Sequence, residues 1–257
     1  MNRTRPEGHR SLRKQAQRTA LMRRVLYDRL PLSGPVRVLD VGCGDGSVTA
    51  DLVDRGLRIV AVDADAARAR RARQRLPGAA PVIVADAHRL PFSDHAFDVA
   101  ICHLLLMWTQ EPAQVVAEMR RVTRPGGTVV AAMEPDYGGK IHEPENPVVD
   151  HVFADTAIRA RGGDPHMGRK LRALFVLAGL ATETGLLNPV VPSCEEDLLA
   201  YQAERQMYRA MLAASGLAHA QIDDWEQQYL ASLRQGSQMN FLPMFYAVGR
   251  VPVDPGR

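Results

Sequence analysis

A glycine-rich turn between an apolar run and a helix-like run constrains the fold of this chain more than any other feature. Residues 38–47 read VLDVGCGDGS, with glycines at alternating positions Gly42, Gly44 and Gly46. Glycine has no Cβ, so it accepts positive φ and lets a ligand lie close to the backbone. A turn of this kind, between a strand and a helix N-terminus, is a common site for nucleotide-like ligands in α/β folds.

The spacing of these glycines separates the turn from two other nucleotide-binding turns. It is G-x-G-x-G, whereas dinucleotide binders use G-x-G-x-x-G. No Lys-Ser/Thr pair follows the glycines, which excludes the P-loop. With Asp40 just ahead of the glycines, the turn resembles the first motif of class I S-adenosylmethionine-dependent methyltransferases.

Strand-like and helix-like runs alternate on both sides of the turn, from residue 36 to residue 134. The expected strands are 36–41, 57–62, 81–85, 97–102 and 128–134, and the expected helices are 47–55, 66–76 and 111–122. Asp65 is placed to cap the second helix, and Pro112 lies near the start of the third. The alternation predicts an α/β fold with a doubly wound, mostly parallel sheet. The resemblance implies seven strands, of which the last, 241–251, is antiparallel.

The resemblance also implies that the chain binds S-adenosylmethionine. Asp63 lies about 20 residues past the glycines, where an acidic side chain meets ribose hydroxyls in nucleotide-binding α/β folds; a helix cap is the alternative. Asp86 follows the third strand, where the family accepts a hydrogen bond from the adenine amine; a turn-forming aspartate is the alternative. The expected cofactor residues are Asp40, Gly42, Gly44, Gly46, Asp63, Ala64, Asp86, Ala87 and His103.

Methyl transfer from a sulfonium does not require a strong base, because the leaving group is already activated and alignment supplies much of the acceleration. His103, at the end of the fourth strand, is the candidate general base, since histidine titrates near neutral pH. The alternative is a histidine that packs or touches only the cofactor. Glu134, Asp136 and Tyr137 follow the fifth strand at the same sheet edge and are substrate candidates, although a polar loop explains them as well.

Two further parts of the chain are expected to surround the sheet edge. Residues 1–35 form an N-terminal helical lid, with a helix over 8–30 whose apolar side includes Leu12, Ala16, Ala20, Val25 and Leu26. Its arginines, Arg23 among them, form either a solvated basic face or part of a lid on the cofactor. Within the main domain, 36–257, segments 140–170 and 195–236 are expected to form a helical cap. Helices are expected over 147–161, 168–178, 195–214 and 222–234, and a strand over 182–191.

Composition excludes several classes of protein. No apolar run approaches the roughly 20 residues of a membrane span, and the basic N-terminus lacks the apolar core of a secretory signal. Three scattered cysteines argue against a disulfide framework, and the histidines lack metal-pair spacing, so we expect a cytoplasmic protein with no metal. A net charge of +3 is too small to imply nucleic acid. Large apolar residues such as Trp108 are assigned mainly to the core, with a few lining a substrate pocket.

The expected function is methyl transfer from S-adenosylmethionine to a small organic acceptor. One alternative is an RNA or tRNA methyltransferase that uses the basic N-terminal helix. The other is a protein that binds S-adenosylmethionine without transferring methyl, such as a cyclase on the same fold. Family resemblance does not identify the acceptor, because one fold hosts many functions.

Overall fold

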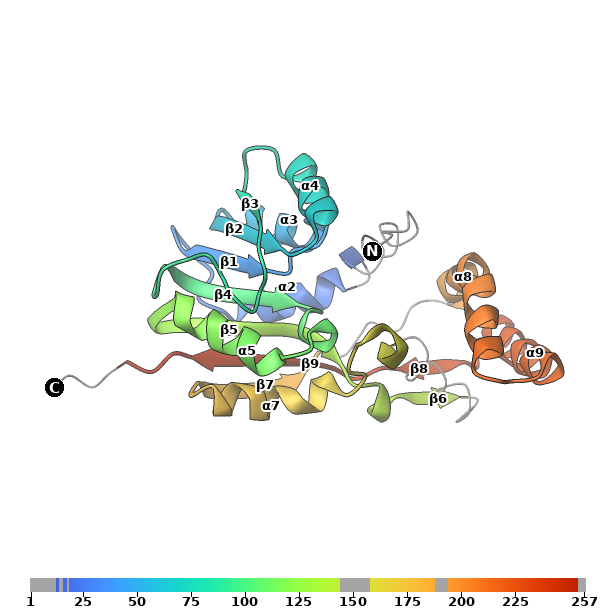
Figure 1. The fold of residues 1–257 in the computed structure, drawn as a ribbon. Coiled ribbons are helices and arrows are strands. Elements are labelled where there is room, and N and C mark those ends of the chain that lie inside the picture. Colours follow the sequence, from blue (N-terminus) through green and yellow to red (C-terminus); the bar gives the residue numbers. More distant parts are fainter. Residues whose placement is uncertain (1–12, 14–15, 18, 144–157, 188–193, 254–257) are drawn as a thin grey trace.

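The computed structural model describes residues 13, 16–17, 19–143, 158–187 and 194–253. Its centre is a seven-stranded sheet of order β3-β2-β1-β4-β5-β9-β7 (Figure 1). The strands are β1 Arg37–Val41, β2 Arg58–Asp63, β3 Val82–Val84, β4 Phe97–His103, β5 Thr123–Pro135, β7 Ala181–Leu186 and β9 Met244–Arg250. Only β9 runs antiparallel to its neighbours in this sheet. The predicted doubly wound sheet with an antiparallel last strand is confirmed, and β9 lies between β5 and β7.

Helices cover both faces of the sheet (Figure 1). They are α2 Ala20–Asp28, α3 Ser47–Val53 and α4 Ala66–Arg75 on one face, and α5 Pro112–Val122 and α7 Met167–Leu177 on the other. Alternate residues of β1 enter the two cores, since Val38 packs with the first group and Leu39 with the second. Burial on both faces explains why the strands read as continuous apolar runs.

Local signals at two helix starts are confirmed. The side chain of Asp65 accepts hydrogen bonds from the N–H groups of Ala67 (2.8 Å) and Arg68 (3.1 Å), so it caps α4 as predicted. Pro112 is the first residue of α5, where its missing N–H costs nothing. Because Asp65 supplies this cap, the carboxylate of Asp63 is not needed for it.

The N-terminal helix differs from its prediction at two points. A turn at Thr19 precedes α2, so the expected helix over 8–30 is interrupted there, and its residues up to 12 lie outside the described part. Val25, expected on the packed side, is exposed, whereas Arg23, expected among the solvated arginines, is only 1% exposed. The side chain of Arg23 contacts the carboxylate of Asp51 in α3, and this distant partner reverses the expected orientation.

The predicted last strand is divided in two. Leu242 and Pro243 interrupt it, which leaves β9 in the main sheet and β8, Met239–Phe241, paired with β6, Ile141–Glu143, in a separate two-stranded sheet. Proline cannot donate to a ladder, which explains the break. The predicted strand over 182–191 starts at Ala181 as β7 and is described as far as Leu186; positions 188–193 lie outside the described residues.

The predicted helices of the cap are confirmed where they are described. They are α8 Cys194–Ala214 and α9 His219–Gln235, which enclose a small core of their own around Tyr201 and Trp225. Figure 1 shows this pair beyond the carboxyl ends of the parallel strands. Most of the predicted helix over 147–161 lies outside the described residues, and its end is the short η4 turn Arg159–Arg161. In the described part of the chain, no helix is long and apolar enough to cross a membrane.

Candidate cofactor site

A cavity of about 520 Å³ opens at the carboxyl ends of β1, β2 and β3. Ligands of open α/β sheets lie at this edge of the strands. The cavity wall contains five of the residues predicted to bind the cofactor, namely Gly42, Asp63, Ala64, Asp86 and Ala87. These residues come from three separate loops, and the fold brings them to one place.

The glycine turn has the backbone geometry that its spacing predicts. Gly42, Gly44 and Gly46 have φ of 77°, 59° and 78°, all in the left-handed region. A Cβ on Gly42 would lie 2.7 Å from Cδ1 of Leu105, so a side chain there would displace the opposite cavity wall. A Cβ on Gly46 would instead lie 3.2 Å from the Cα of Ala72, which shows that this glycine allows α4 to pack. Gly44 and Gly46 do not line the cavity.

Asp63 ends β2 and is 7% exposed at the cavity wall. Its Oδ2 accepts a hydrogen bond from the N–H of Gly44 (2.8 Å), and its Oδ1 accepts one from the N–H of Asp65 (2.8 Å). Each carboxylate oxygen can accept a second hydrogen bond. Asp63 therefore connects β2 to the glycine turn and retains acceptor capacity for the hydroxyl groups of a ligand.

Asp86 follows β3 and also lines the cavity, and its side chain is 65% exposed. Its Oδ1 accepts a hydrogen bond from the N–H of His88 (2.9 Å) and lies 2.7 Å from that residue's Nδ1. These contacts with His88 lower the pKa of Asp86 below its usual range. Among the described residues no group donates a hydrogen bond to its Oδ2, so Asp86 both forms a turn and presents an available acceptor.

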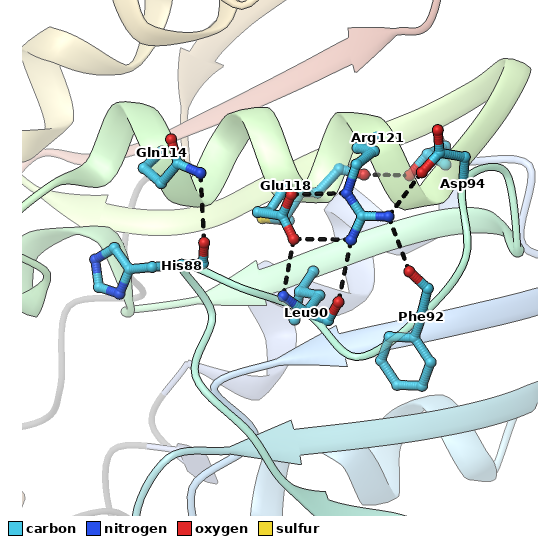
Figure 2. Close-up of polar contacts among 9 residues, drawn as sticks. His88, Leu90, Phe92, Asp94, Gln114, Glu118 and Arg121 are labelled. Atoms are coloured by element: carbon cyan, nitrogen blue, oxygen red, sulfur yellow. Dashed lines mark hydrogen bonds and ion pairs between the residues drawn. The ribbon is translucent and has the colours of Figure 1, made fainter.

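A polar network fixes the loop that carries Asp86 against α5 (Figure 2). The guanidinium of Arg121 donates to the carbonyl oxygens of Leu90 (3.1 Å) and Phe92 (2.8 Å) and to the carboxylate of Asp94 (2.8 Å). It also donates to Glu118, which accepts a hydrogen bond from the N–H of Leu90 (2.8 Å). The sequence analysis missed this network; the spacing of Glu118 and Arg121 in α5 is its only local signal.

Asp40 lies behind the turn rather than in the cavity wall. It is 3% exposed and accepts a hydrogen bond from Oγ1 of Thr49 (2.7 Å), which ties β1 to α3. Burial raises the pKa of Asp40 to about 6. Its observed contacts support the glycine turn from within the protein.

His103 ends β4, as predicted, but it does not line the cavity. Burial lowers the pKa of His103 to about 3, and the charge of Arg23 acts in the same direction. The imidazole is therefore neutral at physiological pH and a weak base. Its Nε2 is buried without a hydrogen-bond partner among the described residues, which leaves one polar atom for a ligand or an unseen water. The described residues contain no cluster of three His, Cys, Asp or Glu side chains suited to a metal.

The three substrate candidates lie at the carboxyl end of β5, where Glu134 and Asp136 have internal partners. Glu134 is fully buried and accepts hydrogen bonds from backbone N–H groups. Burial raises the pKa of Glu134 to about 7, and the hydrogen bonds act in the opposite direction. Asp136 is 2% exposed and pairs with Arg169 (2.8 Å between Oδ1 and Nη2). Tyr137 is half-buried, and burial raises its pKa to about 12. Burial and internal hydrogen bonds at Glu134 and Asp136 favour the alternative, in which these residues support the fold, over contact with a substrate.

A further part of the cavity wall comes from the segment after β4. Leu105 and Trp108 line the cavity together with Thr109, Gln110 and Glu111. Trp108 was expected mainly in the core but is 44% exposed. Its position just past the carboxyl end of a parallel strand is the signal that could have identified it.

A family profile described as a methyltransferase domain matches residues 39–131. The demethylmenaquinone methyltransferase of Renibacterium salmoninarum is 36% identical over 122 residues, which are 47% of this chain and 51% of that protein. The malonyl-[acyl-carrier protein] O-methyltransferase of Halorhodospira halophila is 30% identical over 206 residues, 76% of this chain and 64% of that protein. The chain therefore spans less than two thirds of the length of these relatives.

Among solved structures, the fold is similar to a complex of the Haloferax volcanii Trm112 methyltransferase activator with a methyltransferase. The TM-score is 0.65 at 20% identity, over 96% of this chain and 95% of that one. This similarity concerns the fold, and the matched domain includes the glycine turn, Asp63 and Asp86. Residues 39–131 therefore form a methyltransferase domain, and the chain is similar in sequence and fold to class I S-adenosylmethionine-dependent methyltransferases.

Proposed function

We propose that the chain binds S-adenosylmethionine in the cavity at β1–β3 and transfers its methyl group to a small organic acceptor. The observation that carries this proposal is the meeting of Gly42, Asp63 and Asp86 on one cavity wall. The donor and acceptor groups fit the cofactor, because a carboxylate suits a ribose diol and a second carboxylate suits an exocyclic amine. Gly42 leaves the backbone open to close approach.

Each residue has a defined task in this proposal. Asp63 accepts hydrogen bonds from the ribose hydroxyls, and Oδ2 of Asp86 accepts one from the adenine amine while the backbone N–H of Ala87 bonds the ring. When bound, the cofactor supplies a methyl group activated on a sulfonium. His103 is not the general base in this proposal, since it does not line the cavity and a pKa of about 3 makes it a poor base. Alignment of the acceptor supplies most of the acceleration.

The small-molecule acceptor is supported by the relatives, whose names specify demethylmenaquinone and malonyl-[acyl-carrier protein]. Incubating the protein with cofactor labelled in its methyl group, candidate small molecules and bulk RNA tests the acceptor class. Label in a small organic product supports the proposal. Label in RNA, or a changed product without label, favours one of the two alternatives.

We expect one molecule of S-adenosylmethionine or of its demethylated product S-adenosylhomocysteine to bind each chain, because the described residues bring the predicted ribose and adenine acceptors to one cavity. Isothermal titration calorimetry with each ligand measures the stoichiometry and dissociation constant. The absence of heat and of any thermal shift at millimolar ligand would refute cofactor binding.

We also propose that the N-terminal segment 1–35 and the cap segments 140–170 and 195–236 cover the acceptor. The cap helices α8 and α9 pack mainly on each other, so they are expected to open more readily than the sheet. Amide hydrogen exchange should be faster in α8, α9 and α2 than in β1, β4 and β5, and S-adenosylhomocysteine should slow it. If the amides of α8, α9 and α2 exchange as slowly as those of the strands and are unaffected by ligand, these helices do not act as a lid.

A further inference from the structure

The carboxylate of Glu134 holds the start of a turn that forms part of the cofactor cavity. Its Oε1 accepts hydrogen bonds from the N–H groups of Leu105 (2.9 Å) and Leu106 (2.8 Å), and its Oε2 accepts one from Met107 (3.1 Å). These donors begin the η1 turn, Leu106–Trp108, whose first N–H groups have no partner within the turn. A carboxyl group offers these donors two oxygen atoms, and each oxygen has two lone pairs with which to accept hydrogen bonds. Glu134 has no exposed surface, so water does not compete.

The backbone leaves regular geometry just after β4 and within β5, and this brings the three N–H groups and the carboxylate of Glu134 together. Leu104, directly before the held segment, has φ of 49°, and Met133, directly before Glu134, has φ of 63°. Left-handed backbone is unfavourable for residues with a side chain and persists only where surrounding contacts impose it. The pairing of β5 with β9 also shifts in register between Ala131 and Glu134. Such irregularities redirect side chains at sheet edges, here toward the η1 turn.

The held segment is a wall of the cavity. Leu105 and Trp108 line it, and the side chain of Leu105 lies so close to Gly42 that a Cβ there would come within 2.7 Å. The carboxylate of Glu134 does not line the cavity, so it acts on a ligand only through this wall. A chain of contacts thus runs from β5 through Leu105 to the glycine turn.

We propose that Glu134 is a positioning residue for the cofactor. Its carboxylate holds the cavity wall formed by Leu105–Trp108 against the glycine turn. This inference rests on the proposed function, in which the cavity binds S-adenosylmethionine. It assigns Glu134 a role different from substrate contact. In that role both carboxylate oxygens are needed, because one oxygen accepts two N–H groups and the other accepts the third.

The test compares Glu134→Gln with Asp98→Asn. Glutamine keeps the size of the side chain but has one acceptor oxygen, and its amide N–H₂ would face a backbone donor. Asp98 is the matched control, since its carboxylate accepts hydrogen bonds from the N–H of Arg37 (2.8 Å) and from Nε of Arg124 (2.6 Å) near the start of β4, away from the cavity. Glu134→Gln should weaken S-adenosylhomocysteine binding about tenfold by calorimetry. Asp98→Asn should lower the melting temperature and leave the dissociation constant within about twofold of the unaltered chain.

Leu105→Ala supplies a second variant on the wall itself. It should weaken binding by a similar factor, and the double variant Glu134→Gln/Leu105→Ala should lose less than the product of the two single losses, because Glu134 acts through Leu105. If Glu134→Gln does not fold, Leu105→Ala decides: unchanged binding then overturns the proposal. Unchanged binding by a folded Glu134→Gln overturns the positioning role alone. Absence of binding by the unaltered chain overturns the proposed function and this inference together.

Discussion

Replacing Asp63 by alanine is expected to weaken S-adenosylhomocysteine binding about a hundredfold. A ribose diol can donate two hydrogen bonds to one carboxylate, and bonds to a charged group contribute about 1.5–3 kcal/mol each. The substitution also removes the acceptor for the N–H groups of Gly44 and Asp65, which loosens the glycine turn. Calorimetry on a protein whose fold is verified by circular dichroism measures the loss.

Asp86→Ala provides the comparison for this result. In the proposed complex adenine N6 donates one hydrogen bond to Asp86, and water reaches this exposed side chain, so a loss of about tenfold or less is expected. Asp63→Asn, which keeps one carbonyl acceptor, should fall between the two alanine variants. Equal losses for Asp63→Ala and Asp86→Ala, or a greater loss for Asp86→Ala, would show that the two acids are assigned to the wrong parts of the cofactor.

Asp51→Ala is expected to lower the free energy of unfolding by about 2–4 kcal/mol, because it leaves a buried guanidinium without its anion. Arg23 is 1% exposed and donates from Nε to Oδ2 of Asp51 (3.0 Å), with a second contact from Nη2. Its other hydrogen bonds reach Thr19 and the carbonyl oxygen of Ala16 (2.8 Å). The Asp51 side chain is 38% exposed, so water replaces part of the lost contact and keeps the effect below the largest values for buried pairs.

Asp54→Ala is the matched control, since Asp54 is an exposed acid at the end of the same helix, α3. Its replacement should change the free energy of unfolding by less than about 0.5 kcal/mol. Adding Arg23→Met to Asp51→Ala should recover part of the loss, because an apolar side chain replaces an unpaired buried charge. Urea unfolding measures all three. Equal stability of Asp51→Ala and Asp54→Ala would contradict a stabilising ion pair between Arg23 and Asp51.

Prediction from sequence succeeded where the determining contacts are local. The cap by Asp65 bonds residues two and three positions away, and the glycine turn needs only the conformational freedom of its own residues. The order of the five parallel strands along the chain followed from alternating apolar runs. The carboxyl-edge location of Gly42, Asp63 and Asp86 then followed from the parallel topology, and their meeting at one cavity agrees with it.

Prediction failed where a partner distant in sequence decides the environment of a charge. Arg23 was expected either on a solvated basic face or in a lid on the cofactor, but it is buried and pairs with Asp51, 28 residues later. Glu134 was a substrate candidate, with a polar loop as the alternative, and its residue type and position did not reveal that the N–H groups it accepts from lie 27–29 residues earlier. Neither burial nor a hydrogen-bond partner can be deduced from residue type alone.

The sequence by itself determined the α/β class, the glycine turn and the acids that follow β2 and β3, since these depend on period, spacing and short-range backbone chemistry. Only the tertiary structure decided that β9 lies between β5 and β7, that Trp108 faces the cavity, and that Glu134 faces inward. The physical reason is that a side chain's exposure and charge state depend on which distant groups desolvate it and hydrogen-bond it. Those groups are brought together by folding.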